Sequence, residues 1–274
     1  MQAMTLKELQ ARSLAILEEV HSFCESNNIN YYLAYGSLLG SVRHQGFIPW
    51  DDDVDIMMPR EDYEKFCASF SSNDFGILSE QDSCCFITFC RVYDKKRTIV
   101  KTVSPYNSLR DPGGVWVDIF PLDGAEDDFN GFKKRIRLMR FLWILQCQSR
   151  QSKSSIISIN KSISFKLLFK KIVFLNGIFL RPINKWLIKL AKKCPFGSTN
   201  HWTQTGCIDD GIRSYHSIDA LSFNEYGIFE GHRFRIPIGY HEILTSVYGD
   251  YLKLPPEDER RPKESSVLKF YWRY

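Results

Sequence analysis

Residues Tyr35–Pro59 read YGSLLGSVRHQGFIPWDDDVDIMMP, and the interpretation of the whole chain depends on this stretch. Its first part holds Gly36 and Ser37, small residues that let a backbone come close to a phosphate group. The N–H groups of a helix that starts there would favour the negative charge of the phosphate. The first part therefore predicts a phosphate-binding turn, followed by a short helix over 38–44.

The second part of the stretch contains alternating aspartates in an apolar segment, which predicts a short strand over 53–58. Because side chains alternate along a strand, Asp53 and Asp55 are expected to face the same side. Two neighbouring carboxylates repel each other unless a cation lies between them, and a hard divalent ion with oxygen ligands meets that need. The alternative is a solvated acidic loop, to which Asp51 and Asp52 in particular could belong; the order of the motif favours the metal site.

A third aspartate, Asp118, lies in the apolar run Val115–Phe120, which predicts another strand. An unpaired buried carboxylate is costly, so Asp118 needs a partner. That partner is either a nearby arginine or turn, or a metal ion shared with the strand that carries Asp53 and Asp55. Asp123 follows in a Leu-Asp-Gly sequence that is also typical of an ordinary turn.

Hydrophobic periodicity and turn residues predict the remaining elements. Helices are expected over 6–27, 60–70, 132–147, 162–180, 184–193 and 239–248. Strands are expected over 29–34, 77–80, 85–93 and 97–102, with a hairpin over 229–237. A helix between strands, followed by antiparallel strands, favours a mixed sheet with helices on one side.

Charge is divided unevenly along the chain. Residues 129–208 contain sixteen Lys and Arg and no Asp or Glu, whereas the remainder carries 20 basic and 32 acidic residues. Three interpretations fit this window: a helical bundle with basic outer faces, a surface that lies on anionic lipid, or a nucleic-acid face. The aromatic residues recur at helical spacing, which suits packing or membrane insertion better than base stacking, so nucleic acid is the least favoured partner.

Gly36-Ser37 followed by Asp53-x-Asp55 resembles the signature of the nucleotidyltransferase superfamily, the DNA polymerase β type. The longer string from Gly36 to Ile56 resembles the LicD family of phosphotransferases, which are similar in role to the phosphorylcholine transferases that decorate bacterial surface glycans. The segments Val117–Gly124, Tyr248–Tyr251 and Leu254–Glu257 agree with this resemblance. It is strong over roughly residues 10–124, patchy over 225–260 and weak between them.

The resemblance implies an α+β fold with a nucleotidyltransferase-like mixed β-sheet core flanked by helices and a basic helical insertion or subdomain. Residues 1–128 would form the catalytic core and 129–208 the basic helical region, for membrane or acceptor binding. Residues 209–274 would return to the core, with the Tyr-Gly-Asp and Leu-Pro-Pro segments close to the active site.

The resemblance also implies roles for individual residues. Asp53, Asp55 and Asp118 would hold Mg²⁺ or Mn²⁺, and Asp118 would accept the proton of the attacking hydroxyl. Arg43 would balance the charge of the donor diphosphate. The remaining residues expected around the donor are Gly36, Ser37, Tyr35, Trp50 and His44. An aromatic cage for a choline ammonium would combine Tyr35, Trp50, Trp116 and Phe120.

The function expected from this resemblance is metal-dependent transfer of a phospho-alcohol, with phosphocholine from CDP-choline favoured. The acceptor would be a sugar hydroxyl of a cell-surface glycan, such as teichoic acid or lipopolysaccharide, or of its lipid-linked precursor. One alternative is a nucleotidyltransferase that moves NMP from an NTP to a sugar, a small molecule or a protein. Another is a non-catalytic, membrane-associated glycan-binding protein.

Other classes of protein are disfavoured by the sequence. It contains neither a P-loop nor a Ser-His-Asp pattern, and no run of 18 apolar residues long enough to span a membrane. Charged residues interrupt residues 1–20, so no signal peptide is expected. The expected location is the cytoplasm, with a peripheral position on the inner face of the cell membrane as the alternative.

Overall fold

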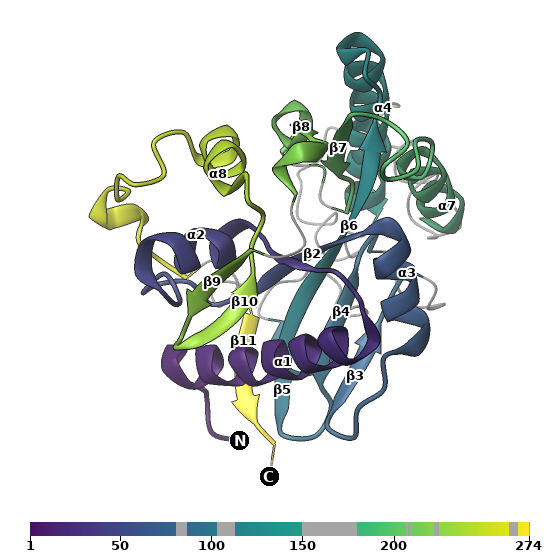
Figure 1. The fold of residues 1–274 in the computed structure, drawn as a ribbon. Helices are drawn as coiled ribbons and strands as arrows, with labels where there is room; N and C mark the ends of the chain where they lie inside the picture. Colours follow the sequence, from purple (N-terminus) through teal and green to yellow (C-terminus); the bar gives the residue numbers. More distant parts are fainter. Residues whose placement is uncertain are drawn as a thin grey trace, which may run out of the picture.

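The structure is a computed structural model of the 274-residue chain. It describes residues 1–80, 87–102, 113–149, 180–206, 208, 210–221, 225–262 and 268–273. Within these ranges the fold is α+β, with a mixed sheet and helices packed against it (Figure 1).

The main sheet has seven strands, and its central strand β6 (Trp116–Ala125) joins its two halves. β6 pairs in parallel with β2 (Asp55–Pro59) and antiparallel with β4 (Cys90–Asp94). The outer strands of the sheet are β1 (Tyr32–Leu33), β3 (Phe75–Leu78), β7 (His201–Gln204) and β8 (His216–Ser217). Because β6 has neighbours on both edges and is almost entirely buried, its sequence is a nearly continuous apolar run.

Three helices in the first 69 residues pack against strands of the main sheet. α1 (Leu6–Asn27) starts at a capping box, in which Thr5 and Glu8 each bond the other's backbone, and its buried residues recur three or four positions apart. α2 (Tyr35–His44) packs near β2, and α3 (Arg60–Ser69) contacts β2 and β6. These elements confirm the helices predicted over 6–27, 38–44 and 60–70 to within a few residues.

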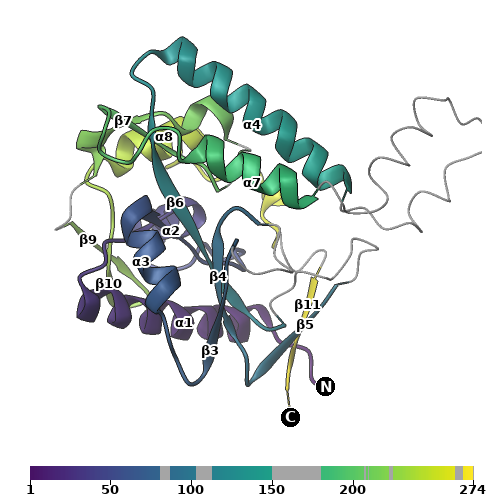
Figure 2. The ribbon, with the colours of Figure 1, turned by 90° about the vertical axis from the view of Figure 1, so that its right-hand side faces the viewer.

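Helices α4 (Phe129–Ser149) and α7 (Leu180–Ala191) pack on each other at the end of the molecule opposite α1 and the termini (Figure 2). They share a second hydrophobic cluster, separate from the core of the main sheet, which includes Phe132, Met139 and Leu187. The helices predicted over 132–147 and 184–193 are therefore confirmed. The helix predicted over 162–180 lies outside the described residues, apart from Leu180.

The C-terminal part returns to the main core, as Figure 1 shows. It begins with a 3-10 turn at Gly211–Ser214 and another at Ile218–Ala220. The hairpin β9 (Tyr226–Phe229) and β10 (His232–Arg235) follows, then α8 (Tyr240–Tyr248) and a 3-10 turn at Glu257–Glu259. The last strand, β11 (Leu268–Trp272), pairs with β5 (Thr98–Thr102) in a sheet of two strands. Sequence periodicity predicted the hairpin and α8 but missed β11.

Candidate functional site

Two of the predicted aspartates lie side by side on neighbouring parallel strands. Asp55 is the first residue of β2 and is the register partner of Asp118 in β6. In-register neighbours share a face of a sheet, so both carboxylates belong to the same face. Asp53 lies before the first residue of β2. The prediction that Asp53 and Asp55 face the same side of one strand is therefore wrong, because the alternation of side chains applies only within a strand. The prediction that Asp118 lies on a strand beside β2 is confirmed.

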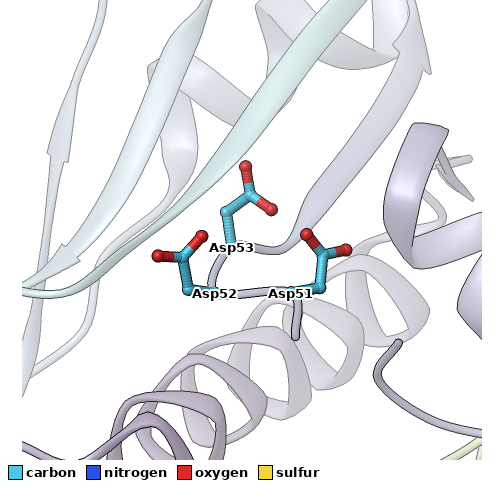
Figure 3. A group of neighbouring side chains, drawn as sticks. All are labelled: Asp51, Asp52 and Asp53. Carbon is cyan, nitrogen blue, oxygen red and sulfur yellow. The ribbon is translucent and has the colours of Figure 1, made fainter. Parts of the chain in front are cut away.

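Asp53 belongs instead to an acidic loop with Asp51 and Asp52. One carboxylate oxygen from each of these three residues lies within 4.8 Å of the others. The three side chains leave the loop on the same side (Figure 3). The side-chain amide of Gln10, on α1, donates to the Asp51 carbonyl over 2.8 Å and anchors the loop. The loop Asp51–Asp53, for which a solvated loop was the alternative interpretation, therefore brings three carboxylates close together.

The Gly-Ser segment touches both groups of aspartates. A Cβ atom at Gly36 would collide with the Oδ2 atom of Asp51, so a larger residue here would push this carboxylate out of its present position. The hydroxyl of Ser37 accepts a hydrogen bond of 2.9 Å from the backbone N–H of Asp55. Tyr35, just before them, has φ of 45° in the left-handed region, which is uncommon for a residue with a side chain. Strained residues of this kind cluster at functional sites.

The loop between α2 and the acidic residues is fixed by the β9–β10 hairpin. Glu230 accepts a hydrogen bond from the N–H of Phe47 over 2.9 Å and donates its own N–H to the Gln45 carbonyl over 2.9 Å. Ser41 donates to the carbonyl of Ile228 over 2.8 Å. The C-terminal third of the chain therefore positions the loop that leads to Asp51.

Asp118 is paired with Arg91, a residue on β4 that the sequence patterns did not single out. The Arg91 Nε donates to Asp118 Oδ1 over 2.6 Å, and Nη2 donates to Oδ2 over 3.4 Å. The guanidinium lies over the rings of Trp116, at 4.6 Å, and Phe89, at 5.4 Å. Arg91 is the register partner of Asp118 in the antiparallel β4–β6 pair. Its role could have been predicted only if the pairing of these two strands had been known.

Arg43 and His44 lie at the end of α2 and contact each other. Arg43 Nε donates to His44 Nε2 over 3.0 Å, and its Nη1 donates to the Tyr251 carbonyl over 2.7 Å. Desolvation and the charge of Arg43 lower the pKa of His44. His44 is thus biased toward its neutral form, and Arg43 links α2 to the turn that follows α8. Their roles in binding a donor stay predictions.

The aromatic residues proposed as a cage are divided in the structure. Tyr35 and Phe120 meet edge to face at 5.5 Å, and Phe89 joins them with its ring 4.7 Å from that of Phe120. Trp116 is next to Arg91. Trp50 has the guanidinium of Arg260, from the C-terminal tail, 5.6 Å from its ring centroid.

Tyr248, at the end of α8, faces the acidic groups. Desolvation raises the pKa of its hydroxyl, and the charges of Asp55, Asp51, Asp210 and Asp53 raise it further. The hydroxyl therefore stays protonated at neutral pH and is able to donate a hydrogen bond. This places the Tyr248 side chain near the aspartates.

Comparison with known proteins agrees with this geometry. A family model described as LicD/FKTN/FKRP, nucleotidyltransferase domain, matches residues 28–144. The lipopolysaccharide cholinephosphotransferase LicD of Haemophilus influenzae is 30% identical over 278 residues, which span 96% of this chain and 97% of the relative. This chain belongs to the LicD family. It is accordingly a transferase of the phosphotransferase type.

Two shorter matches to proteins of unassigned function cover only part of this LicD-family chain. An uncharacterized protein of Rickettsia typhi is 47% identical over 58 residues, 21% of this chain and 19% of its own length. An uncharacterized protein of Rickettsia prowazekii is 49% identical over 47 residues, 17% of this chain and 18% of its own length.

The residues present fit a divalent metal ion. Mg²⁺ and Mn²⁺ prefer carboxylate oxygens, and the acidic loop together with Asp55 and Asp118 supplies such oxygens from adjoining segments. The pairing of Asp118 with Arg91 does not exclude this role, because each carboxylate oxygen has two lone pairs and an arginine uses one of them. Arg91 would then orient a metal-binding carboxylate from outside.

Asp123, by contrast, is a structural residue. It is fully buried and accepts hydrogen bonds from the Nε of Arg60, over 2.8 Å, and from its Nη2, over 2.6 Å. The hydroxyl of Thr205 also donates to it. Asp123 lies within β6, so the turn considered from its Leu-Asp-Gly sequence is not formed.

Proposed function

We propose that this LicD-family chain transfers phosphocholine from CDP-choline to a sugar hydroxyl of a cell-surface glycan or its lipid-linked precursor. Two observations carry the proposal: Asp55 and Asp118 are register partners on β2 and β6, and the acidic loop Asp51–Asp53 precedes β2 and lies next to Gly36. The full-length similarity to a lipopolysaccharide cholinephosphotransferase supports the choice of the transferred group and of a glycan acceptor.

In this proposal Asp53, Asp55 and Asp118 hold Mg²⁺ or Mn²⁺, with Asp51 and Asp52 as additional oxygen donors. A divalent ion bound there would neutralise the diphosphate charge and make the hydroxyl more acidic. The chain's own residues would do the rest. Gly36 keeps the Asp51 carboxylate close, Ser37 ties the turn to β2, and Arg43 adds positive charge at the donor.

The reaction forms a bond between the acceptor oxygen and the choline-bearing phosphorus, and breaks the bond from that phosphorus to the bridging oxygen. CMP leaves with the bridging oxygen, and Asp118 takes the proton of the hydroxyl. Arg91 would hold the Asp118 carboxylate in place throughout. Protonated Tyr248 would donate a hydrogen bond to a phosphate oxygen.

A test of this proposal separates it from the alternatives. Purified protein is incubated with Mg²⁺ and either CDP-choline or ATP, with a glycan acceptor, and CMP and pyrophosphate are measured. Release of CMP that disappears with EDTA and in Asp53→Asn is expected. Pyrophosphate release from ATP would indicate nucleotidyl transfer, and neither product would indicate a non-catalytic glycan-binding protein.

A lipid-linked acceptor would bring the enzyme to a membrane surface, and the α4–α7 region suits that task. Leu138, Phe141 and Ile144 on α4 and Trp186 on α7 are exposed, Phe141 by 57% and Trp186 by 58%. Lys189 lies 5.7 Å from the Trp186 ring. Exposed apolar groups among basic ones favour an anionic lipid surface. None of the described helices has the length and apolar character needed to cross a membrane.

Vesicle sedimentation tests this peripheral contact. The protein should pellet with phosphatidylglycerol vesicles at low salt and less at high salt, and Phe141→Ser with Trp186→Ser should weaken pelleting. Leu252→Ser is the matched control, because Leu252 is 62% exposed but follows α8. Equal pelleting of the double variant and the wild type would remove this part of the proposal.

A further inference from the structure

A pocket opens next to the acidic site, between α2, β2, β7, the turn at Gly211–Ser214 and α8. Its walls are mostly apolar, and three of its lining residues are aromatic: Tyr35, Trp202 and Tyr248. Trp202 is held in position because its Nε1 donates to the Ser217 carbonyl over 2.9 Å and its ring packs on His216 at 4.8 Å.

The pocket has one carboxylate and no lysine or arginine among the described residues that line it. Asp210 lines it, and this carboxylate contributes to the raised pKa of Tyr248. Arg213 forms an ion pair of 3.2 Å with Asp210, and because the Arg213 side chain is 52% exposed, solvent screens this pair. His216 also lines the pocket, and desolvation lowers its pKa, so it adds no positive charge at neutral pH.

The pocket adjoins the place proposed for the phosphates. Tyr35 directly precedes Gly36 and Ser37 in the chain. Tyr248 lies close enough to Asp51, Asp53 and Asp55 for their charges to raise the pKa of its hydroxyl. A group attached to a phosphate at the first turn of α2, which holds Gly36 and Ser37, would lie next to the pocket, because Tyr35 and Leu38 of the same helix line it.

Apolar walls, aromatic rings and one carboxylate form the chemistry that binds a compact cation with an apolar surface. Apart from the tyrosine hydroxyls, the polar lining among the described residues is confined to Gln204, Asp210, Ser214 and His216. Hydroxyl groups of a polyol that face the leucine and isoleucine walls would therefore have no hydrogen-bond partner. We propose that this pocket binds the quaternary ammonium headgroup of the transferred phospho-alcohol and selects it over neutral headgroups. This inference rests on the proposed function and assigns the choice of alcohol to residues outside the acidic site.

Two variants test the pocket. Asp210→Asn removes its carboxylate, and Val247→Trp fills it from a lining residue of α8 that is only partly buried. Asp219→Asn is the matched control, since it removes the same charge from an exposed position that does not line the pocket. Circular dichroism and the melting temperature establish that each variant is folded.

The first readout is kcat/KM for CDP-choline relative to CDP-glycerol, whose headgroup is neutral. The wild type and Asp219→Asn should prefer CDP-choline, and Asp210→Asn and Val247→Trp should lose about tenfold of that preference. The second readout, independent of turnover, is phosphocholine binding by calorimetry in the presence of Mg²⁺, which both pocket variants should weaken.

The outcomes separate the two proposals. Transfer from CDP-choline with unchanged selectivity and binding in both pocket variants would overturn the pocket and leave the proposed function intact. Phosphocholine binding that is lost in Val247→Trp, without any CMP release, would support the pocket and overturn the proposed function. Absence of both binding and transfer in the wild type would overturn both.

Discussion

The two ends of strand β6 each carry an aspartate paired with an arginine, but the surroundings of the two pairs differ. Asp123 is completely buried, and Arg60 and Thr205 bond to its carboxylate from inside the protein. The Asp118 side chain is 13% exposed, has one short bond to Arg91 and lies opposite Asp55. The residues are five positions apart, so they face opposite sides of the sheet.

This difference shows that an aspartate within an apolar strand does not by itself indicate a site. A carboxylate whose hydrogen bonds are satisfied by buried partners stabilises the fold, and removing it leaves a buried charge. A carboxylate with an acidic neighbour and access to solvent is suited to bind a cation. Asp123 fits the first description and Asp118 the second.

The largest effect is expected from Asp118→Asn. If Asp118 binds metal and accepts a proton, kcat for phosphocholine transfer should fall on the order of 10³-fold, the scale of losing a group that stabilises transition-state charge. The melting temperature should change little, because Arg91 keeps its contacts with Trp116 and Phe89. If folded Asp118→Asn turned over at nearly the normal rate, Asp118 would be a structural residue, as Asp123 is.

Asp123→Asn should act on stability. The substitution removes the paired hydrogen bonds of a charged partner from buried Arg60 and leaves it the longer ion pair of 3.8 Å to Glu80, so the free energy of unfolding should fall by about 3 kcal/mol. Urea denaturation measures that loss. At a low temperature where the variant stays folded, kcat should remain within a few-fold of the wild type; a large loss of kcat in folded protein would contradict the structural assignment.

A smaller effect on activity is expected from Arg91→Lys. The ammonium keeps the charge but cannot make the paired bonds to Asp118 or lie flat over the aromatic rings. The loss should be about 30-fold in kcat/KM, as for groups that orient metal ligands, with a weaker apparent affinity for Mg²⁺. A Mg²⁺ titration of activity is the measurement, and an unchanged Mg²⁺ dependence would separate Arg91 from the site.

The smallest effect is expected from Thr205→Val, which keeps the shape of the side chain and removes one hydrogen bond to Asp123. The free energy of unfolding should fall by about 1.5 kcal/mol, because the lost bond has a charged acceptor. Kinetic constants should be unchanged at temperatures where the protein is folded. A loss of activity without a loss of stability would link the Asp123 side of the sheet to catalysis.

Local patterns in the sequence predicted most of the elements. The apolar spacing of α1 predicted that helix without any tertiary information. Features that depend on contacts between distant segments were missed or misjudged. The end of the 129–208 window, predicted to be helical, forms strand β7 through its pairing with β6. β11 is a strand through its pairing with β5, and the strand predicted from Asp53 begins at Asp55, where pairing with β6 begins.

The candidate site was predictable in part. The order of Gly36, Ser37, Asp53 and Asp55 marked one segment, and the family resemblance added Asp118. Arg91 and Asp210 were not predicted as site residues, and Tyr248 was expected near the site only through the family resemblance of its Tyr-Gly-Asp segment. Each comes from a segment that reaches the aspartates only in the folded chain.

The sequence by itself determined the family, most helices and strands, and the acidic segment, because these follow from local periodicity and from short motifs. Only the tertiary structure decided which carboxylates meet, which arginine each one pairs with, and which residues of α8 and β7 border the pocket. The physical reason is that strand register and helix packing join residues far apart in the chain, and burial then determines whether a charge stabilises the fold or remains available to bind a ligand.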